Sequence, residues 1–181
     1  MKHLKMIALG ILIIAGAPRV AVGQSSPSID VEDIRAMLIH GFEMGRMMDV
    51  EFARAIPDSA LRWAPTEGVR NFSDQVAHGG MGNTLFASMA LGVERPPRDT
   101  AAYLNDKEAL VEALNQAYDW VIEGLQALPA EQFLADTELF GQTMPVWRAY
   151  LQSLEHGYWT RGQIVPYFRL NGMKPPSYRA F

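Results

Sequence analysis

The chain has 181 residues, of which 49% are hydrophobic and 20% are charged, values that suit one globular domain and argue against a disordered or fibrous protein. It contains no cysteine, which excludes disulfides, thiolate zinc sites and a catalytic cysteine. The net charge is −4, and an acidic chain without a basic cluster is a poor candidate for binding nucleic acid or an anionic membrane.

The start of the chain has the features of a secretory signal peptide. Two lysines precede a short apolar run at residues 6–17, and Ala21 and Gly23 place small residues before a cleavage site. The run is shorter than the roughly 20 residues that a membrane-spanning helix needs. We therefore expect a signal peptide at residues 1–23, a mature domain at residues 24–181, and a periplasmic or secreted protein that is not membrane-bound after cleavage.

The first half of the mature chain predicts two long helices. The first covers about residues 31–56, where apolar side chains recur at steps of three and four and Pro57 follows. The second begins at Asn71, which can cap a helix together with Asp74, and ends near Gly92. Three glycines crowd this second helix: Gly79, Gly80 and Gly82. They allow either close packing of another helix or room for a ligand, because glycine removes side-chain bulk in both cases.

The second half predicts two more helices. The third opens with Asn105 and Glu108, a capping pair, and ends before Pro129. The fourth covers about residues 145–170, because Pro145 suits a first helical turn and Asn171 begins a stop signal. No run of strand length alternates apolar and polar residues, so no strand is predicted. Four amphipathic helices bury their apolar faces most simply in an all-α four-helix bundle.

The fourth helix carries a polar stripe without formal charge at neutral pH. Its members recur at steps of three or four: Ser153, His156, Thr160, Gln163 and Tyr167. Solvent-facing helix surfaces in this chain carry charged residues, so an uncharged polar stripe indicates partial burial, where such groups find hydrogen-bond partners. We expect these residues to face the bundle interior or a pocket. A buried histidine in such a stripe is either a hydrogen-bonded core residue or a ligand.

A second histidine, His78, lies on the expected inward face of the second helix with Leu85 and Met89. Two inward histidines on two helices are how bundle cores build metal sites. A catalytic zinc site has three protein ligands and an open position. A histidine four residues after His156 would complete the set, but that position is Thr160.

Several short motifs occur together on the second and fourth helices. They are VRNF at residues 69–72, QVAH at 75–78, EH at 155–156, RGQ at 161–163, and YFRLNG at 167–172 running into PP at 175–176. In this combination the chain resembles DinB-like proteins of the DinB/YfiT type over most of its mature length. The resemblance implies a four-helix bundle that binds a divalent metal ion, such as zinc, nickel, iron or manganese, through three histidines. Members with known activity include thiol-dependent transferases and hydrolases.

The resemblance carries over to His78 and His156, but not to the third ligand. The family usually has HxxHHRGQ, whereas this chain has HGYWTRGQ, with Trp159 and Thr160 where histidines are usual. Threonine is a poor neutral ligand for metals that prefer imidazole nitrogen. We therefore expect a weakened or lost metal site, with Trp159 filling space that a metal would need.

Two functions remain open at this point. One is an exported metal-dependent hydrolase or transferase acting on a small molecule. The other is a non-catalytic bundle that has lost its metal and binds a small molecule or a protein partner. His40 or Glu43 of the first helix could join the site, and the aromatic residues of the fourth helix could pair two copies into a homodimer.

Overall fold

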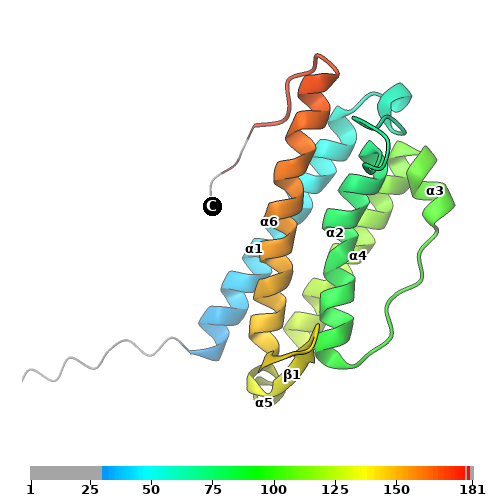
Figure 1. The fold of residues 1–181 in the computed structure, drawn as a ribbon. Coiled ribbons are helices and arrows are strands. Elements are labelled where there is room, and N and C mark those ends of the chain that lie inside the picture. The colour runs from blue at the N-terminus through cyan, green and yellow to red at the C-terminus, as the bar shows by residue number, and fades with distance from the viewer. Residues whose placement is uncertain (1–29, 178, 180–181) are drawn as a thin grey trace, which may run out of the picture.

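The computed structural model describes residues 30–177 and residue 179, and the expected signal peptide at residues 1–23 lies outside them. Four long helices form an all-α bundle, which confirms the predicted fold class (Figure 1). Their bounds are Val31–Ala55 for α1, Phe72–Leu91 for α2, Lys107–Ala127 for α4 and Val146–Leu170 for α6. Among the described residues, no helix is both long and apolar enough to cross a membrane.

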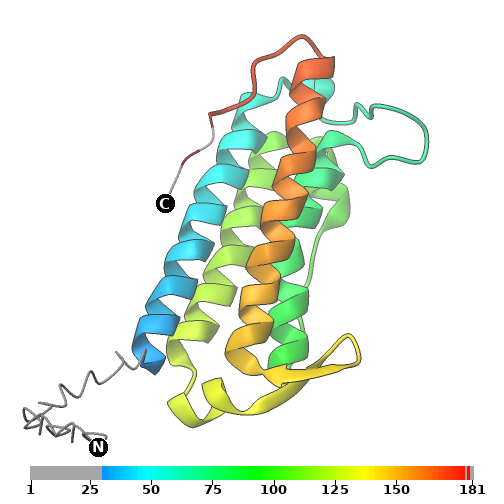
Figure 2. The ribbon, with the colours of Figure 1, turned by 60° about the vertical axis from the view of Figure 1, so that its left-hand side comes forward.

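Each long helix has two neighbours in the bundle. α1 lies beside α4 and α6, and α2 lies beside the same two helices (Figures 1 and 2). α1 and α6 run in one direction, and α2 and α4 run in the other. The parallel pair α2 and α4 is possible because residues 92–99 return along the bundle as a long connection before the short helix α3, Thr100–Asn105.

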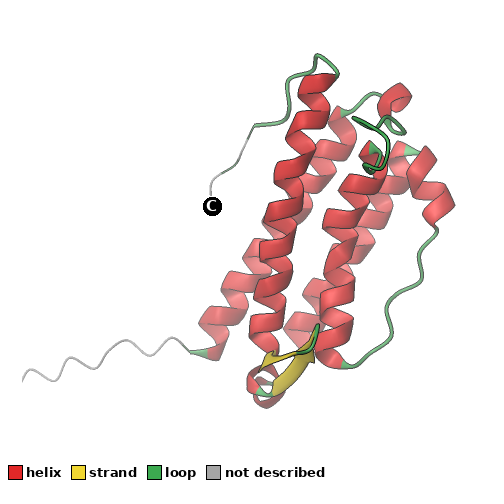
Figure 3. Cartoon of the chain, viewed as in Figure 1, coloured by secondary structure: helices red, strands yellow, loops and turns green. Residues whose placement is uncertain are grey.

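Shorter elements close the two ends of the bundle (Figure 3). They are the 3-10 turn η1 (Asp58–Ala60), the helix α5 (Ala130–Leu134), and the strands β1 (Asp136–Leu139) and β2 (Gln142–Pro145). The two strands pair antiparallel, so the expectation of no strand is wrong. The turn between them takes positive φ at Phe140 (50°) and Gly141 (78°), as tight hairpin turns do.

Helix capping follows the sequence at α2 and departs from it at α4. Asn71 caps α2, and its side-chain oxygen accepts a hydrogen bond from the backbone N–H of Asp74 at 3.0 Å. The cap of α4 is Asp106 rather than Asn105, because Asn105 is the last residue of α3. The Asp106 carboxylate accepts from the N–H of Ala109 at 2.8 Å. Asp106 is also the residue that ends α3, so one residue serves as the C-cap of α3 and the N-cap of α4.

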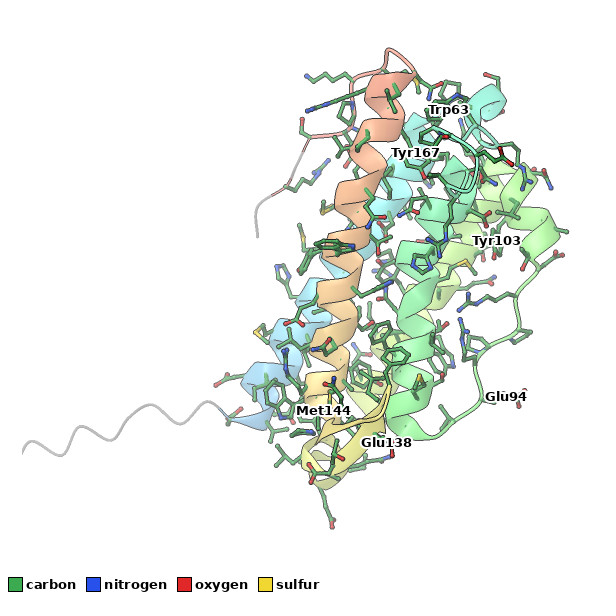
Figure 4. The ribbon with its side chains drawn as sticks, viewed as in Figure 1. Trp63, Glu94, Tyr103, Glu138, Met144 and Tyr167 are labelled. Carbon is green, nitrogen blue, oxygen red and sulfur yellow. The ribbon has the colours of Figure 1, made fainter. Side chains whose placement is uncertain are left out.

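The core consists mainly of aliphatic and aromatic side chains between the four helices. Phe42, Phe72 and Phe168 are fully or almost fully buried within it. At the far end of α6, the ring of Trp63 packs edge-on against Tyr167 with centroids 5.9 Å apart (Figure 4). This aromatic contact holds the connection between α1 and α2 against α6.

Candidate functional site

The two histidines singled out by the sequence meet where α2 contacts α6. The Nε2 atoms of His78 and His156 lie 3.3 Å apart. Their rings are almost perpendicular, at 78°, with centroids 5.0 Å apart. Both side chains are partly buried, so the pair lies at the edge of the bundle core with some contact to solvent.

The glycines of α2 make room for side chains from the neighbouring helices. A β-carbon on Gly82 would lie 3.2 Å from Cε1 of His156, and one on Gly79 would lie 3.0 Å from the methyl carbon of Thr160. A β-carbon on Gly80 would overlap Leu114 of α4. Close helix packing therefore explains the three glycines, and the space beside them is filled by the protein itself.

An aromatic wall borders the histidine pair, and sequence reasoning did not find it. The ring centroid of Phe86 on α2 lies 5.2 Å from that of His156. The ring centroid of Phe140, at the hairpin tip, lies 5.3 Å from that of Phe86. Phe140 is 59% exposed and takes a positive φ of 50°, which is unusual for a residue with a bulky side chain. The hairpin that carries this ring was itself missed, so no signal in the sequence pointed to the contact.

Both imidazoles favour the neutral state. Burial lowers the pKa of His78, and repulsion from the positive charge of Arg70, and from His156 whenever it is protonated, lowers it further. Burial also lowers the pKa of His156, with added repulsion from Arg70 and Arg161. At neutral pH each ring therefore keeps one nitrogen lone pair, which can accept a hydrogen bond or bind a cation.

Thr160 and Trp159 occupy the positions where the family pattern expects histidines. Thr160 is 2% exposed, and its hydroxyl donates a hydrogen bond to the backbone carbonyl of His156 at 2.8 Å. This hydroxyl is thus engaged with its own helix. Trp159 is 75% exposed, so the expectation that it fills the interior space is wrong. The side chain follows His156 by three residues on α6 and points to the outside of the bundle.

The other members of the polar stripe are engaged within the protein. Ser153 and Tyr167 are buried as expected, whereas Gln163 is exposed, so the expected burial of the stripe is wrong for this residue. Each has a polar partner on or just before α2, which explains why the stripe carries no charge. The partners are the Asn83 amide for Ser153 (2.8 Å), the Gln75 amide for Gln163 (3.1 Å) and the backbone carbonyl of Arg70 for Tyr167 (2.7 Å).

A buried ionic cluster lies deeper in the bundle, and the sequence analysis did not predict it. Arg161 of α6 contacts the Asp49 carboxylate of α1 at 3.2 Å, and the Tyr118 hydroxyl of α4 donates to the same carboxylate oxygen at 2.6 Å. Asp49 is fully buried and Arg161 is 4% exposed. Burial raises the pKa of Asp49 despite both partners. Burial alone would lower the pKa of Arg161, but Asp49 and Tyr118 keep it raised.

The first helix does not supply a third metal ligand. His40 and Glu43 are both exposed on α1. Across residues 30–177 and 179, no group of three or more histidine or carboxylate side chains is arranged to hold a metal ion. Among these described side chains, no third histidine or carboxylate forms such a group with the two imidazoles.

The pair fits a metal ion as two ligands and does not fit a three-histidine centre. Zn–N bonds of about 2.0–2.1 Å put two nitrogens of one tetrahedral ion about 3.3–3.4 Å apart, close to the 3.3 Å between His78 and His156. A metal-ligating histidine usually donates its other ring N–H to a carboxylate or carbonyl. Nδ1 of His156 is buried without a partner, and the Thr160 hydroxyl is engaged elsewhere. The residues present therefore do not build a closed or catalytic three-ligand site.

The sequence profile of the DinB superfamily matches residues 42–164, which span the bundle from α1 to α6. The chain belongs to the DinB superfamily. Among curated proteins, none is similar enough to the chain to count as a relative.

Two solved structures of DinB-like proteins share this fold. The chain superposes on a DinB-like protein from Bacillus cereus with a TM-score of 0.67 and 16% identity, covering 82% of this chain and 97% of the other. For a DinB-like protein from Bacillus subtilis the TM-score is 0.64 at 18% identity, covering 79% and 98%. At these identities the similarity shows that this chain shares the bundle fold of the two DinB-like proteins.

Proposed function

We propose that this DinB-superfamily protein is a non-catalytic binding bundle whose histidine pair holds a divalent metal ion weakly. His78 and His156 would be its protein ligands. The remaining positions on the ion would be open to water or to a donor atom of a small molecule. The 3.3 Å separation of the two Nε2 atoms is the observation that carries this proposal.

The protonation and packing of the site support weak binding. Both imidazoles have lowered pKa values, so neither has to lose a proton at neutral pH before binding a cation. Against this, Thr160 offers no free hydroxyl, and Nδ1 of His156 has no partner that would orient the ring. With two protein ligands, one of which lacks a hydrogen-bond partner to orient it, we expect a metal affinity well below that of a three-histidine site.

A metal-dependent hydrolase or transferase is the competing function. A bound divalent ion can lower the pKa of a water molecule and so supply a nucleophile. That chemistry needs a firmly held ion, and the described side chains provide two protein ligands instead of three. We therefore place binding ahead of catalysis for this chain.

Export and self-association belong to the same proposal. The leader pattern at residues 1–23 supports secretion or a periplasmic location. On α6, Trp159 is 75% exposed and Tyr158 is 38% exposed, and this aromatic surface would suit a homodimer contact.

Calorimetric titration of metal-free protein with Zn²⁺ tests the proposal. We expect a single weakly bound ion per chain in the wild type, and its loss in both His78→Gln and His156→Gln. His40→Gln provides the matched control, because His40 is an exposed histidine on α1. Binding that survives both site substitutions would overturn the proposal. Tight stoichiometric metal together with turnover of simple ester or amide substrates would favour the hydrolase.

A further inference from the structure

A cavity of about 410 Å³ lies between α1 and α6, away from the histidine pair. Its size is within the range of small-molecule sites, which are mostly apolar clefts with a few polar groups. Neither His78 nor His156 contributes to its wall. Most of the side chains in the wall are apolar or aromatic, among them Met48, Phe52, Tyr158 and Val165.

Gly162 is an exposed residue of α6 that lines the cavity and has open space beside it. A β-carbon on most other helical glycines of the described chain would press on a neighbour, as on Gly82 and Gly157, each at 3.2 Å. A β-carbon on Gly162 would have no such atom within 4 Å. Glycine is unfavourable inside a helix, and no close contact explains why a glycine stands at position 162. A side chain at this position would project beside the cavity that Gly162 lines.

The charges around the cavity are already paired. Arg161 is bound to the buried Asp49 at 3.2 Å. Glu51 is paired at 3.2 Å with Arg179, which belongs to the C-terminal segment, here meaning residues 173–177 and 179. A charged ligand would therefore find no free counter-ion among the lining residues and would lose its own hydration on entry. The walls favour an uncharged, mainly apolar molecule.

The C-terminal segment covers the cavity. After α6 ends, the backbone N–H of Met173 bonds to the carbonyl of Phe168 at 2.9 Å, and the chain turns back towards α1 (Figures 1 and 2). Pro176 and Ser177 then form part of the cavity wall. Because the chain's own segment lies across this face, a protein partner has less access to it than a small molecule has. The ion pair that holds the cover is partly exposed, at 51% for Arg179 and 35% for Glu51, so the cover can open at low cost.

We propose that this cavity is a second binding site, for a small uncharged apolar molecule, and that the C-terminal segment is its cover. The site is independent of the histidine pair, so it stands whether or not the pair binds a metal ion.

Fluorescence titration with N-phenyl-1-naphthylamine, an uncharged aromatic probe, tests the site. We expect saturable binding to the wild type and a loss of affinity of at least tenfold in Gly162→Leu, whose side chain would stand at the cavity wall and reduce the space for the probe. Gly124→Leu is the matched control. It is a helical glycine of α4 outside the cavity, and a β-carbon there would have the Tyr150 hydroxyl at 3.9 Å, an ordinary contact.

The cover is tested by the release rate of the same probe. Arg179→Ala removes the ion pair and should speed release of the probe by up to about fivefold. This ratio corresponds to the largest free energy that an exposed ion pair usually contributes. Arg169→Ala, an exposed arginine of α6 that does not line the cavity, should leave the rate unchanged.

Three results would overturn the proposal. The first is a wild type that does not bind the probe, and the second is equal affinity in Gly162→Leu and the wild type. The third is a probe signal that appears only at protein concentrations where size-exclusion chromatography shows a dimer, because a second copy would then form the binding surface. Circular dichroism of each variant shows that the bundle is intact.

Discussion

Thr160 of α6 faces Gly79 of α2, and a β-carbon on Gly79 would lie 3.0 Å from the Thr160 methyl carbon. The two helices are therefore in close contact one turn beyond His156, at the position where a third imidazole is expected in the family pattern. The contact also places residue 160 next to the helix that carries His78.

Replacing Thr160 with histidine should strengthen metal binding. A third imidazole on the same face of α6 as His156 would complete a three-ligand set. We expect Zn²⁺ affinity to rise by more than the roughly 10–100-fold that an outer-shell partner of a metal ligand contributes. Competition with a chromophoric chelator measures the change. Thr143→His, on the exposed hairpin, serves as control, and an unchanged affinity in Thr160→His would mean that the helices do not present position 160 to the histidine pair.

The histidine pair should make the protein less stable in mild acid. The folded-state pKa values of His78 and His156 are lowered from 6.5, so the unfolded chain takes up protons first as the pH falls through about 6.5. The free energy of unfolding should be highest above this pH and decline below it. Urea unfolding between about pH 8 and pH 5 measures the decline.

The double variant His78→Gln/His156→Gln isolates this effect. It should show a flatter pH dependence than the wild type, while His40→Gln keeps the wild-type slope. Burial also raises the pKa of Asp49, but that carboxyl is present in every protein compared and its contribution cancels. Parallel slopes in the wild type and the double variant would contradict the lowered histidine pKa values.

Breaking the buried ion pair should be costly. Arg161→Met leaves the fully buried Asp49 carboxylate without its cation, and we expect the free energy of unfolding to drop by about 3–5 kcal/mol. Adding Asp49→Asn should recover much of the loss, because the amide oxygen can still accept from Tyr118 and no charge remains. Arg148→Met removes an exposed pair with Glu155 and should cost less than about 1 kcal/mol. Urea denaturation gives all three values, and similar losses in Arg161→Met and Arg148→Met would refute the argument.

Two helical glycines should respond in opposite directions to the same substitution. Gly80→Ala places a methyl group against Leu114 and 3.0 Å from the Asp49 carboxylate, so we expect a loss of about 1–3 kcal/mol. Gly162→Ala meets no atom within 4 Å and should gain up to about 1 kcal/mol from helix propensity. Thermal unfolding followed by circular dichroism compares the two. A loss at Gly162 would show that its neighbours are closer than described.

The long helices were predictable because each carries an apolar stripe over many turns. The predicted range of residues 31–56 agrees with α1 to within one residue, and the fourth helix begins one residue after Pro145. The hairpin was not predictable, because each of its strands has only four residues and β1 has a single buried side chain, Leu139. Such short strands depend on the turn and on contacts with the bundle rather than on their own pattern.

The candidate site was predictable in part. Stripes on two helices pointed to His78 and His156, and the structure brings these two residues together. The exposure of Trp159 was not predicted. Matching the sequence to a family motif does not show which face of the helix a residue takes when it replaces the usual histidine. Asp49 was overlooked as a buried group, although it lies on the same face of α1 as Phe42 and Phe52. A charge within an apolar stripe is a signal that a partner must come from another helix.

The contact between Arg161 and Asp49 also limits how the helices can slide. An apolar surface tolerates a shift of one helix along another, since similar side chains recur at each turn. A shift of α6 by one turn, about 5.4 Å, would separate this pair and leave two desolvated charges facing hydrocarbon. The ion pair thus fixes the axial register of α6 relative to α1. A partner or ligand that pushed α6 along its axis would therefore have to break this pair first.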